Sequence, residues 1–288
     1  MASLKEVKNR ISTVQSTRKI TSAMKMVASS KLHHAQQDIE RLRPYADNVR
    51  NMTSRFLGGD AGPAAQYAPR PVHRVAMVLF TSNSSLCGAF NANAVKQLLH
   101  NVQTMQQQQG VEIARIYTVG KKGAESVRKT GLPIVADHHN LVDHPAYAGS
   151  SVIARELMQG FIAGEWDKVV LVYHHFRSAG SQVLTTATLL PIDASEADGQ
   201  HSAGADAYIV EPDAATVLQT LLPQTITLSL HAALLDNIAS EHAARVIAMQ
   251  VATDNADELL RELTLTYNKT RQQAITTELL DIVGGSMA

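Results

Sequence analysis

The sequence predicts an α/β protein in which two long terminal helices form an antiparallel coiled coil beside a central Rossmann-like α/β domain. Narrow apolar stripes with helical spacing occupy both ends of the chain. Short apolar runs alternate with helical segments in the middle, which is typical of a mostly parallel sheet. Neither terminal stripe is stable alone in water, so we expect the two ends to pair and to project from the domain as a stalk. The expected segments are 1–58, 74–210 and 211–288.

The N-terminal segment, residues 3–57, has the pattern of one helix on the order of 80 Å long. Ser3 is the expected N-cap, with Glu6 completing a capping box. Pro44 is expected to kink or divide the helix, and Gly58–Gly59 to end it. The apolar stripe, with steps of three and four, consists of Leu4, Val7, Ile11, Val14, Ile20, Met24, Val27, Leu32, Ala35, Ile39, Leu42, Ala46, Val49, Met52 and Phe56.

The central segment follows a Pro-, Gly- and Ala-rich linker at residues 60–73. Its apolar runs predict strands, and the last of them, Ser181–Leu190, alternates like an antiparallel edge strand. The other expected strands are Val75–Phe80, Glu112–Val119, Pro133–Ala136 and Lys168–Tyr173, and the expected helices are Asn91–Gln107, Lys122–Thr130 and 148–164.

The C-terminal segment predicts a second long helix that begins after an N-cap at Asp213 and runs to about Val283. Pro223 is expected to interrupt it early. The uninterrupted part, 225–283, would be about 85 Å long at the usual helical rise. Its stripe includes Leu230, Leu234, Ile238, Ala244, Ala248, Val251, Leu259, Leu263, Tyr267 and Ala274.

Charge is unevenly distributed along a chain whose formal net charge is zero. Residues 1–57 hold eleven basic and four acidic side chains, whereas residues 213–288 hold four basic and nine acidic ones. Opposite charges suit either two segments that pair or two separate partner surfaces, and ordinary helix solvation is the alternative. The neutral total gives a nucleic-acid partner no support. No window approaches the roughly 20 apolar residues of a membrane span, so no direct membrane insertion is expected.

Catalytic and cofactor motifs are sparse. The segment Thr81–Asn91 follows the first expected strand, where doubly wound domains bind ligands, but it lacks a phosphate-binding loop. Gly120–Gly123 could attract an anion at a helix start, although a plain turn is the simpler interpretation. The single cysteine, Cys87, lacks a local base and is interpreted as a small, partly buried side chain. We therefore expect no catalytic residue and no cofactor.

Adjacent histidines occur three times, which raises the question of a metal site. Neighbouring residues point apart on a helix or a strand, so two adjacent histidines do not readily share one metal ion. No carboxylate pattern completes a site, and no metal is expected. The pairs are His33–His34, His138–His139 and His174–His175.

Sequence motifs at both ends resemble those of a known family. Ile20–Lys31 (ITSAMKMVASSK), Ser240–Asn255 (SEHAARVIAMQVATDN) and Tyr267–Gly285 (YNKTRQQAITTELLDIVGG) are similar to the terminal segments of gamma subunits of F-type ATP synthases. SSLCGAFN at residues 84–91 and Ser181–Pro191 agree with the middle of that family. The resemblance covers nearly the whole chain and keeps its order.

The resemblance implies a rotor that carries out no catalysis itself. In that family the terminal helices form an antiparallel coiled coil inside a ring of alpha and beta subunits, and the α/β domain contacts the c-ring and the epsilon subunit. Proton flow turns the c-ring, and the uneven shaft drives each beta site through binding, synthesis and release. The complex lies on the cytoplasmic face of the bacterial inner membrane, with this subunit peripheral to it.

The resemblance also assigns contact residues, each of which has a structural alternative such as a seam residue or an exposed charge. Val210 stands where a relative has an aromatic residue, and Asn83–Ser85 where relatives often have Asp-Arg-Gly. The expected beta-subunit coupling contacts are Met24, Arg245, Gln272, Thr276 and Glu278, and the expected contacts of the foot with the c-ring and epsilon are Arg43, Tyr208 and Glu211.

Two other functions compete with the rotor. One is an α/β enzyme or nucleotide-binding domain with coiled-coil oligomerisation arms, and the missing phosphate loop and catalytic constellation argue against it. The other is a nucleic-acid adaptor that uses the basic N-terminal helix, which would bind DNA in a strongly salt-dependent way.

Overall fold

A computed structural model describes residues 3–57, 62, 64–107, 110–192, 210–211 and 213–286. The chain forms two compact units. The terminal unit contains residues 1–29 and 245–288, and the central unit contains residues 30–244. Both long helices contribute residues to each unit, and every contact below lies within one unit. The predicted boundaries 1–58, 74–210 and 211–288 stay a prediction.

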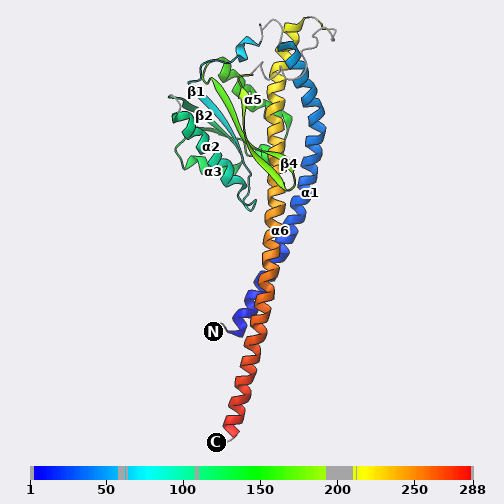
Figure 1. The fold of residues 1–288 in the computed structure, drawn as a ribbon, viewed down its shortest axis with the longest axis vertical. Helices are drawn as coiled ribbons and strands as arrows, with labels where there is room; N and C mark the ends of the chain where they lie inside the picture. Colours follow the sequence, from blue (N-terminus) through cyan, green and yellow to red (C-terminus); the bar gives the residue numbers. More distant parts are fainter. Residues whose placement is uncertain are drawn as a thin grey trace. The chain divides into compact units, whose positions relative to one another are not determined.

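The central unit contains a five-stranded sheet in the order β3-β2-β1-β4-β5 (Figure 1). The first four strands in sequence pair in parallel, and β5 pairs antiparallel with β4 at the edge. This arrangement confirms the predicted fold class and the predicted edge strand. The strands are β1 (Arg74–Phe80), β2 (Glu112–Val119), β3 (Ile134–Asp137), β4 (Lys168–Ser178) and β5 (Ser181–Leu190).

Apolar side chains cover both faces of this sheet. Alternate residues of β1 point to opposite faces, so Met77 and Leu79 pack toward α2 and α3 while Val78 and Phe80 face α5 and the long C-terminal helix α6 (Ala214–Ser286). Two short elements, η1 and α4, were not predicted, because three or four residues carry too little periodicity. The helical elements between the long helices are η1 (Ala65–Tyr67), α2 (Phe90–Gln107), α3 (Lys121–Arg128), α4 (Asn140–Asp143) and α5 (Tyr147–Ile162).

The two long helices are α1 (Leu4–Leu57) and α6 (Ala214–Ser286). Their predicted N-caps are confirmed. The backbone N–H of Glu6 donates to the Ser3 hydroxyl at 3.2 Å, and the N–H of Thr216 donates to the Asp213 carboxylate at 2.8 Å. These bonds satisfy N–H groups that the first helical turn leaves without an intrahelical acceptor.

Proline does not divide either helix. Of the two outcomes predicted at Pro44, a kink or a division, the division is therefore wrong and the kink stays a prediction, and the predicted interruption at Pro223 is wrong. A proline inside a helix removes the hydrogen bond to the carbonyl four residues earlier. Those carbonyls belong to Glu40 and Gln219, and both residues are exposed. Water can therefore satisfy the released groups, and packing of the helices in the central unit stabilises the continuous form.

Within the central unit, α6 is buried on nearly all sides rather than along a narrow seam. It contacts α1 through the Thr53–Thr225 hydroxyl pair at 2.7 Å, and β4 through Asn237. A helix with α1 on one flank and a sheet on another must be apolar around most of its circumference. The single-stripe prediction was wrong for this stretch, because a single stripe is sufficient for only one packing partner and α6 has two.

In the terminal unit the seam lies on a slightly different face from the predicted one. Val27 and Val251 are 59% and 52% exposed, whereas Ala28 and Met249 are buried. Ile20 is also exposed. Apolar residues spaced three and four apart do not decide which of two adjacent residues faces the other helix. The small Ala28 allows the helices to approach closely, whereas Val27 would not.

Candidate interaction site on the coiled coil

Three polar contacts join α1 to α6 in the terminal unit. The Arg18–Asp257 ion pair measures 2.9 Å, the Thr21 and Thr253 hydroxyl oxygens lie 2.8 Å apart, and Lys25 donates to Gln250 at 2.7 Å. Residue numbers rise along α1 as they fall along α6, so the helices are antiparallel, as predicted. Polar pairs at fixed positions specify this register, because a shift of one turn would separate all of them.

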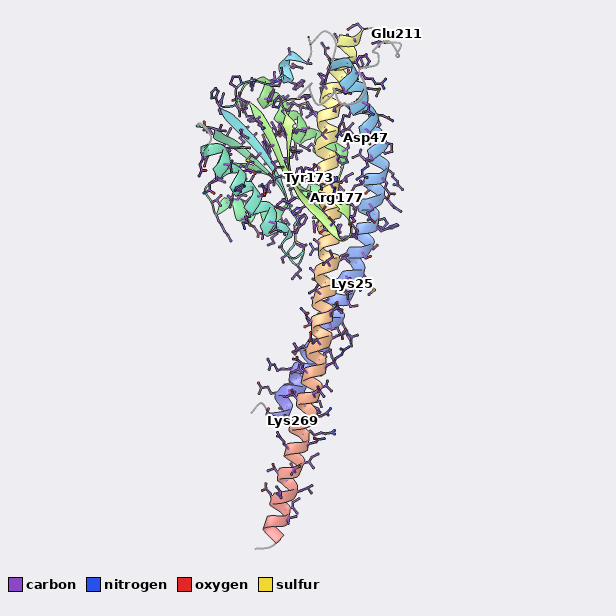
Figure 2. All side chains as sticks on the ribbon, in the orientation of Figure 1. Lys25, Asp47, Tyr173, Arg177, Glu211 and Lys269 are labelled. Atoms are coloured by element: carbon purple, nitrogen blue, oxygen red, sulfur yellow. The ribbon has the colours of Figure 1, made fainter. Side chains whose placement is uncertain are left out.

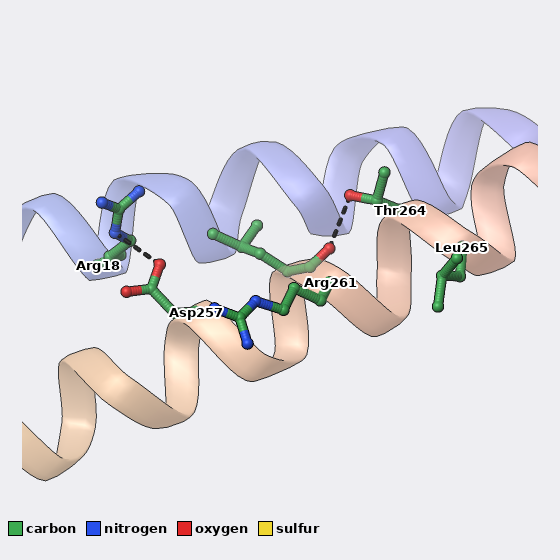
Figure 3. Close-up of a pocket in the computed structure, with 6 residues that line it drawn as sticks. Arg18, Asp257, Arg261, Thr264 and Leu265 are labelled. Carbon is green, nitrogen blue, oxygen red and sulfur yellow. Dashed lines mark hydrogen bonds and ion pairs between the residues drawn. The ribbon is translucent and has the colours of Figure 1, made fainter.

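Beside the Arg18–Asp257 pair, the surface of the helix pair is hollowed into a shallow groove of about 470 Å³ (Figure 3). Arg261, Thr264 and Leu265 also line it. The Thr264 hydroxyl donates a hydrogen bond to the carbonyl of Leu260 in its own helix at 2.7 Å. The groove therefore presents two guanidinium groups and leucine side chains, a surface suited to contact and without a reacting group.

Two of the predicted coupling residues lie near the three polar contacts between α1 and α6. Met24 is half-buried on α1, between Thr21 and Lys25. Arg245 on α6 is only 8% exposed, so its interpretation as a solvated surface charge is wrong. Burying a guanidinium is costly unless it is paired, which makes Arg245 a structural part of its surroundings as well as a candidate contact.

The other three predicted coupling residues lie near the C-terminal end of α6. Gln272, Thr276 and Glu278 are exposed, and the Thr276 hydroxyl donates to the carbonyl of Gln272 at 2.9 Å. Side chains project from this part of the helix on every side beyond Lys269 (Figure 2). Large apolar residues are among them. The exposed apolar side chains are Ile275, Leu279, Leu280, Ile282 and Val283.

The predicted foot residues are only partly described. Tyr208 lies outside the described residues, whereas Arg43 on α1 and Glu211 just before α6 are exposed. Among the residues that the structure covers, no ion pair joins Arg43 to Glu211. Burial raises the pKa of Asp236, and the nearby charges of His175 and Arg43 oppose that rise. Arg43 therefore already has an electrostatic role inside the chain.

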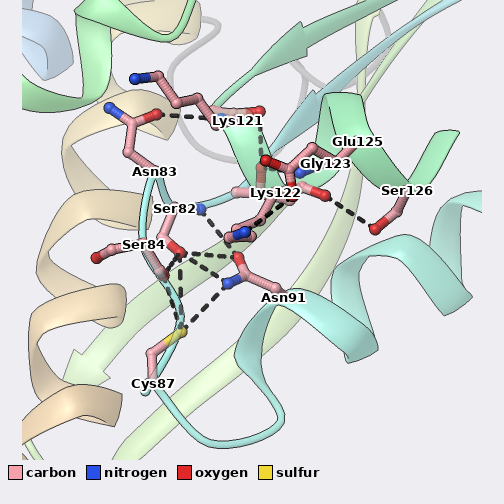
Figure 4. Close-up of polar contacts among 12 residues, drawn as sticks. Ser82, Asn83, Ser84, Cys87, Asn91, Lys121, Lys122, Gly123, Glu125 and Ser126 are labelled. Atoms are coloured by element: carbon pink, nitrogen blue, oxygen red, sulfur yellow. Dashed lines mark hydrogen bonds and ion pairs between the residues drawn. The ribbon is translucent and has the colours of Figure 1, made fainter. Parts of the chain in front are cut away.

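The loop after β1 closes over the start of α3 (Figure 4). The N–H of Lys121 donates to the Asn83 side chain at 3.1 Å, and the N–H of Gly123 donates to the Thr81 hydroxyl at 2.9 Å. The N–H of Lys122 donates to the carbonyl of Ser82 at 3.1 Å. The chain thus occupies the N–H groups that an anion would need. The predicted plain turn is corrected in one respect, because Lys121–Gly123 form the first turn of α3 and Gly120 precedes it as the N-cap residue.

Cys87 is buried in the same loop. Its sulfur accepts a hydrogen bond from the Asn91 amide at 3.3 Å and lies 3.7 Å from the Ser82 hydroxyl. Asn91 also receives the backbone N–H of Ser82 at 2.9 Å. These contacts hold the loop against the first turn of α2, which is a structural role for the thiol.

Histidines 174 and 175 point in different directions, as expected of neighbours on a strand. The His174 ring stacks on Phe90 with centroids 4.1 Å apart, and His175 contacts the Asp236 carboxylate at 2.5 Å. Burial lowers the pKa of His174 to about 4. Within the described ranges, no group of three or more His, Cys, Asp or Glu side chains has the arrangement of a metal site.

Sequence reasoning missed the polar face of α6 that meets β4. Asp236, Asn237 and Ser240 contact His174 and His175 in an otherwise apolar stretch of the helix. The spacing 236, 237 and 240 places them on one helical face. The sequence does show these three polar residues on one face of an otherwise apolar helix. It does not show that this face contacts β4.

None of the helices in the described part of the chain has a stretch apolar and long enough to cross a bilayer. The fold defines a class of protein: an antiparallel coiled coil of two long terminal helices, with a Rossmann-like domain between them in the sequence.

Comparisons with known proteins identify the family. The model of the ATP synthase family matches residues 3–288. The chain is 52% identical over 291 residues to the ATP synthase gamma chain of Bacteroides fragilis, and 42% identical over 292 residues to that of Flavobacterium johnsoniae. The first alignment covers all of both chains, and the second covers 100% of this chain and 99% of the relative.

Solved structures agree with this family. The chain is similar to a chain in the central stalk and c-ring structure of the Tetrahymena thermophila mitochondrial ATP synthase, with a TM-score of 0.60, 26% identity and coverage of 81% and 99%. A chain of the Euglena gracilis mitochondrial ATP synthase shares the fold, with a TM-score of 0.65, 22% identity and coverage of 99% and 93%. The chain belongs to the ATP synthase gamma-chain family. It is accordingly a non-catalytic central-stalk subunit.

Proposed function

We propose that this chain couples rotation of a c-ring, driven by proton flow, to conformational cycling of catalytic sites on surrounding beta subunits. Its partners are alpha and beta subunits around the coiled coil, and the c-ring and an epsilon subunit at the α/β domain. The complex lies on the cytoplasmic face of the bacterial inner membrane, and this chain is peripheral to it. A rotor drives a site only when its contacts with that site differ between rotational positions.

The end of α6 carries this proposal. Residues 271–283 are exposed on every side, and Leu279, Leu280 and Ile282 are 57%, 65% and 68% exposed. A single helix with a large exposed apolar surface is unstable in water and is stabilised when apolar residues of a partner pack against it. A collar formed by alpha and beta subunits supplies one, and weakly directional apolar contacts allow the helix to turn inside it.

Contacts farther along the shaft provide the coupling. Met24 is half-buried, so part of its flexible side chain is available to a beta-subunit loop. Gln272, Thr276 and Glu278 are exposed and offer polar contacts near the end of α6. Arg245, which is 8% exposed, is a further proposed contact. On the α/β side, the proposed contacts with the c-ring and epsilon are Arg43, Tyr208 and Glu211.

The nucleotide-binding alternative has less support, because loop side chains and a loop carbonyl already occupy the N–H groups at the start of α3. Co-purification distinguishes the two functions. The tagged chain is expected to bring alpha, beta and epsilon subunits and the c-ring out of native membranes. Tight nucleotide binding with turnover by the purified chain alone would favour the enzyme instead.

A further inference from the structure

Strand β4 is longer than its neighbour β1. The parallel pairing of these strands ends at Leu79 and Val172, but β4 continues to Ser178. On its other side, β5 pairs with β4 as far as Ser178 and Ser181. In the part of the chain that the structure describes, no strand pairs with β4 on its β1 side beyond Val172. The backbone there needs other hydrogen-bond partners.

Helix α6 supplies those partners with its side chains. The backbone N–H of His174 donates to the Asn237 side-chain oxygen at 3.3 Å, and the Ser240 hydroxyl donates to the carbonyl of His174 at 3.0 Å. Asn237 and Ser240 are both fully buried, and His174 is 4% exposed. Because the N–H and C=O of one strand residue point to the same side, two helix side chains replace a missing strand here.

A third contact lies beside these two. The His175 ring nitrogen and the Asp236 carboxylate oxygen are 2.5 Å apart. His175 follows His174 directly, and Asp236 precedes Asn237. One helical face is therefore joined to one dipeptide of the sheet by two hydrogen bonds and an imidazole–carboxylate contact.

These bonds fix the helix in a way that apolar packing does not. Hydrophobic contacts are non-directional, whereas hydrogen bonds weaken steeply as their angles change. Asn237 and Ser240 are three residues apart and lie on the same face of α6. A small rotation of α6 about its own axis would therefore move both side chains away from His174 at once. The buried partners would then be left without hydrogen bonds, which is costly.

We propose that Asp236, Asn237 and Ser240 form a torsional clamp that holds α6 at one rotational angle against β4 and thereby passes torque between the α/β domain and the shaft. The clamp rests on the proposed rotor function. Its members are positioning residues, since they act on α6 and on no reacting group. The rest of α6 in the central unit packs mainly through apolar contacts, which resist separation more than they resist turning.

The first test measures whether the contacts hold the strand. An Asn237→Leu/Ser240→Ala variant in the assembled complex should exchange the His174 amide hydrogen about fivefold faster or more, since a buried hydrogen bond protects it. Thr225→Val is the matched control, because it removes a partly buried hydroxyl pair between α6 and α1 and leaves β4 untouched. If the double variant fails to assemble, Asn237→Ala alone serves, because Asn237 is the acceptor of the His174 N–H. Unchanged exchange at His174 would overturn the clamp.

The second test measures torque. Complexes in closed vesicles hydrolyse ATP while the proton gradient builds up against them. The clamp variant is expected to match the wild type in uncoupled hydrolysis and in the initial pumping rate, and to reach a smaller maximal gradient. The Thr225→Val control should reach the full gradient. A full gradient in the clamp variant would contradict the clamp, whereas a wild-type complex that hydrolyses ATP without pumping would contradict the proposed function itself.

Discussion

Thr21 of α1 and Thr253 of α6 share a hydrogen bond, with their hydroxyl oxygens 2.8 Å apart across the helix pair. One hydroxyl donates its single proton to the other, which remains able to donate to a carbonyl of its own helix. That carbonyl belongs to Arg18 for Thr21 and to Met249 for Thr253, and each hydroxyl can donate to it when its partner across the pair is removed. The pair therefore helps to specify the antiparallel register without leaving either hydroxyl dependent on the other.

Replacing Thr21 with Val should lower the free energy of unfolding by only about 0.5–1 kcal/mol, because Thr253 keeps its carbonyl partner. The Thr21→Val/Thr253→Val double variant should cost less than the two single variants added together, since one bond is lost only once. Urea unfolding of the full-length chain measures both. Strictly additive costs would show that the two hydroxyls do not interact.

The Arg18–Asp257 ion pair should contribute little to stability. Its side chains are 49% and 41% exposed, and ion pairs at that exposure are typically worth about 0–1 kcal/mol. Arg18→Ala is therefore expected to change the urea midpoint only slightly at low salt and not at all in 1 M NaCl, where a Debye length of about 3 Å screens the pair. A large loss that persists at high salt would contradict this view.

Stability should depend on pH through His174. Burial lowers its pKa from 6.5 to about 4, so between these values the unfolded chain binds a proton that the folded chain does not. The free energy of unfolding is therefore unaffected by this histidine above pH 6.5. It decreases as the pH falls from 6.5 toward 4, by up to about 3 kcal/mol in total. A His174→Gln variant should show a correspondingly weaker pH dependence of the urea midpoint. His231, whose pKa burial also lowers, should keep its own share in that variant. Identical pH profiles for wild type and variant would refute the assignment.

Gly120 should tolerate no side chain. Its φ is +119°, and an added Cβ would collide with the backbone and hydroxyl of Thr81. Gly131 is the control, because its φ is +74° but nothing lies within 4 Å of the position of a Cβ. Gly120→Ala should cost about 2 kcal/mol more than Gly131→Ala in thermal or urea unfolding. Equal costs would show that the loop after β1 adjusts freely.

Most of the fold could be predicted because the local pattern and the packing agree. The strands Glu112–Val119 and Ser181–Leu190 have the predicted bounds, since alternation and turn residues mark both ends. β4 runs five residues past the predicted end at Tyr173. The polar residues His174 and His175 ended the apolar run, but β4 continues because β5 pairs with it on one side and side chains of α6 bond His174 on the other.

The candidate site was less accessible to sequence reasoning. The helical stripe predicted the coiled coil, but the choice of Ala28 over Val27 for the seam depends on how closely the helices approach. The burial of Arg245 likewise follows from tertiary packing. Asp236, Asn237 and Ser240 were unremarked because a polar residue acquires its meaning from its partner, and that partner lies about 60 residues earlier in the sequence.

Met24 is the most accessible residue with which to test coupling separately from assembly. Met24→Lys places a charge on a half-buried position of the shaft, which we propose to face a beta-subunit loop. The complex should assemble and hydrolyse ATP, but ATP-driven proton pumping should fall. Met24→Leu, which keeps an apolar side chain of similar volume, should pump normally. Pumping by Met24→Lys at the wild-type rate would argue against a coupling role.

Rotation within the assembled complex tests the central claim most directly. Cys87 is buried, so a Ser181→Cys variant offers an exposed thiol on the edge strand for a fluorescent or bead probe. With the alpha and beta subunits fixed to a surface, the probe should turn in one direction while ATP is hydrolysed. Hydrolysis at the full rate with a stationary probe would contradict the account.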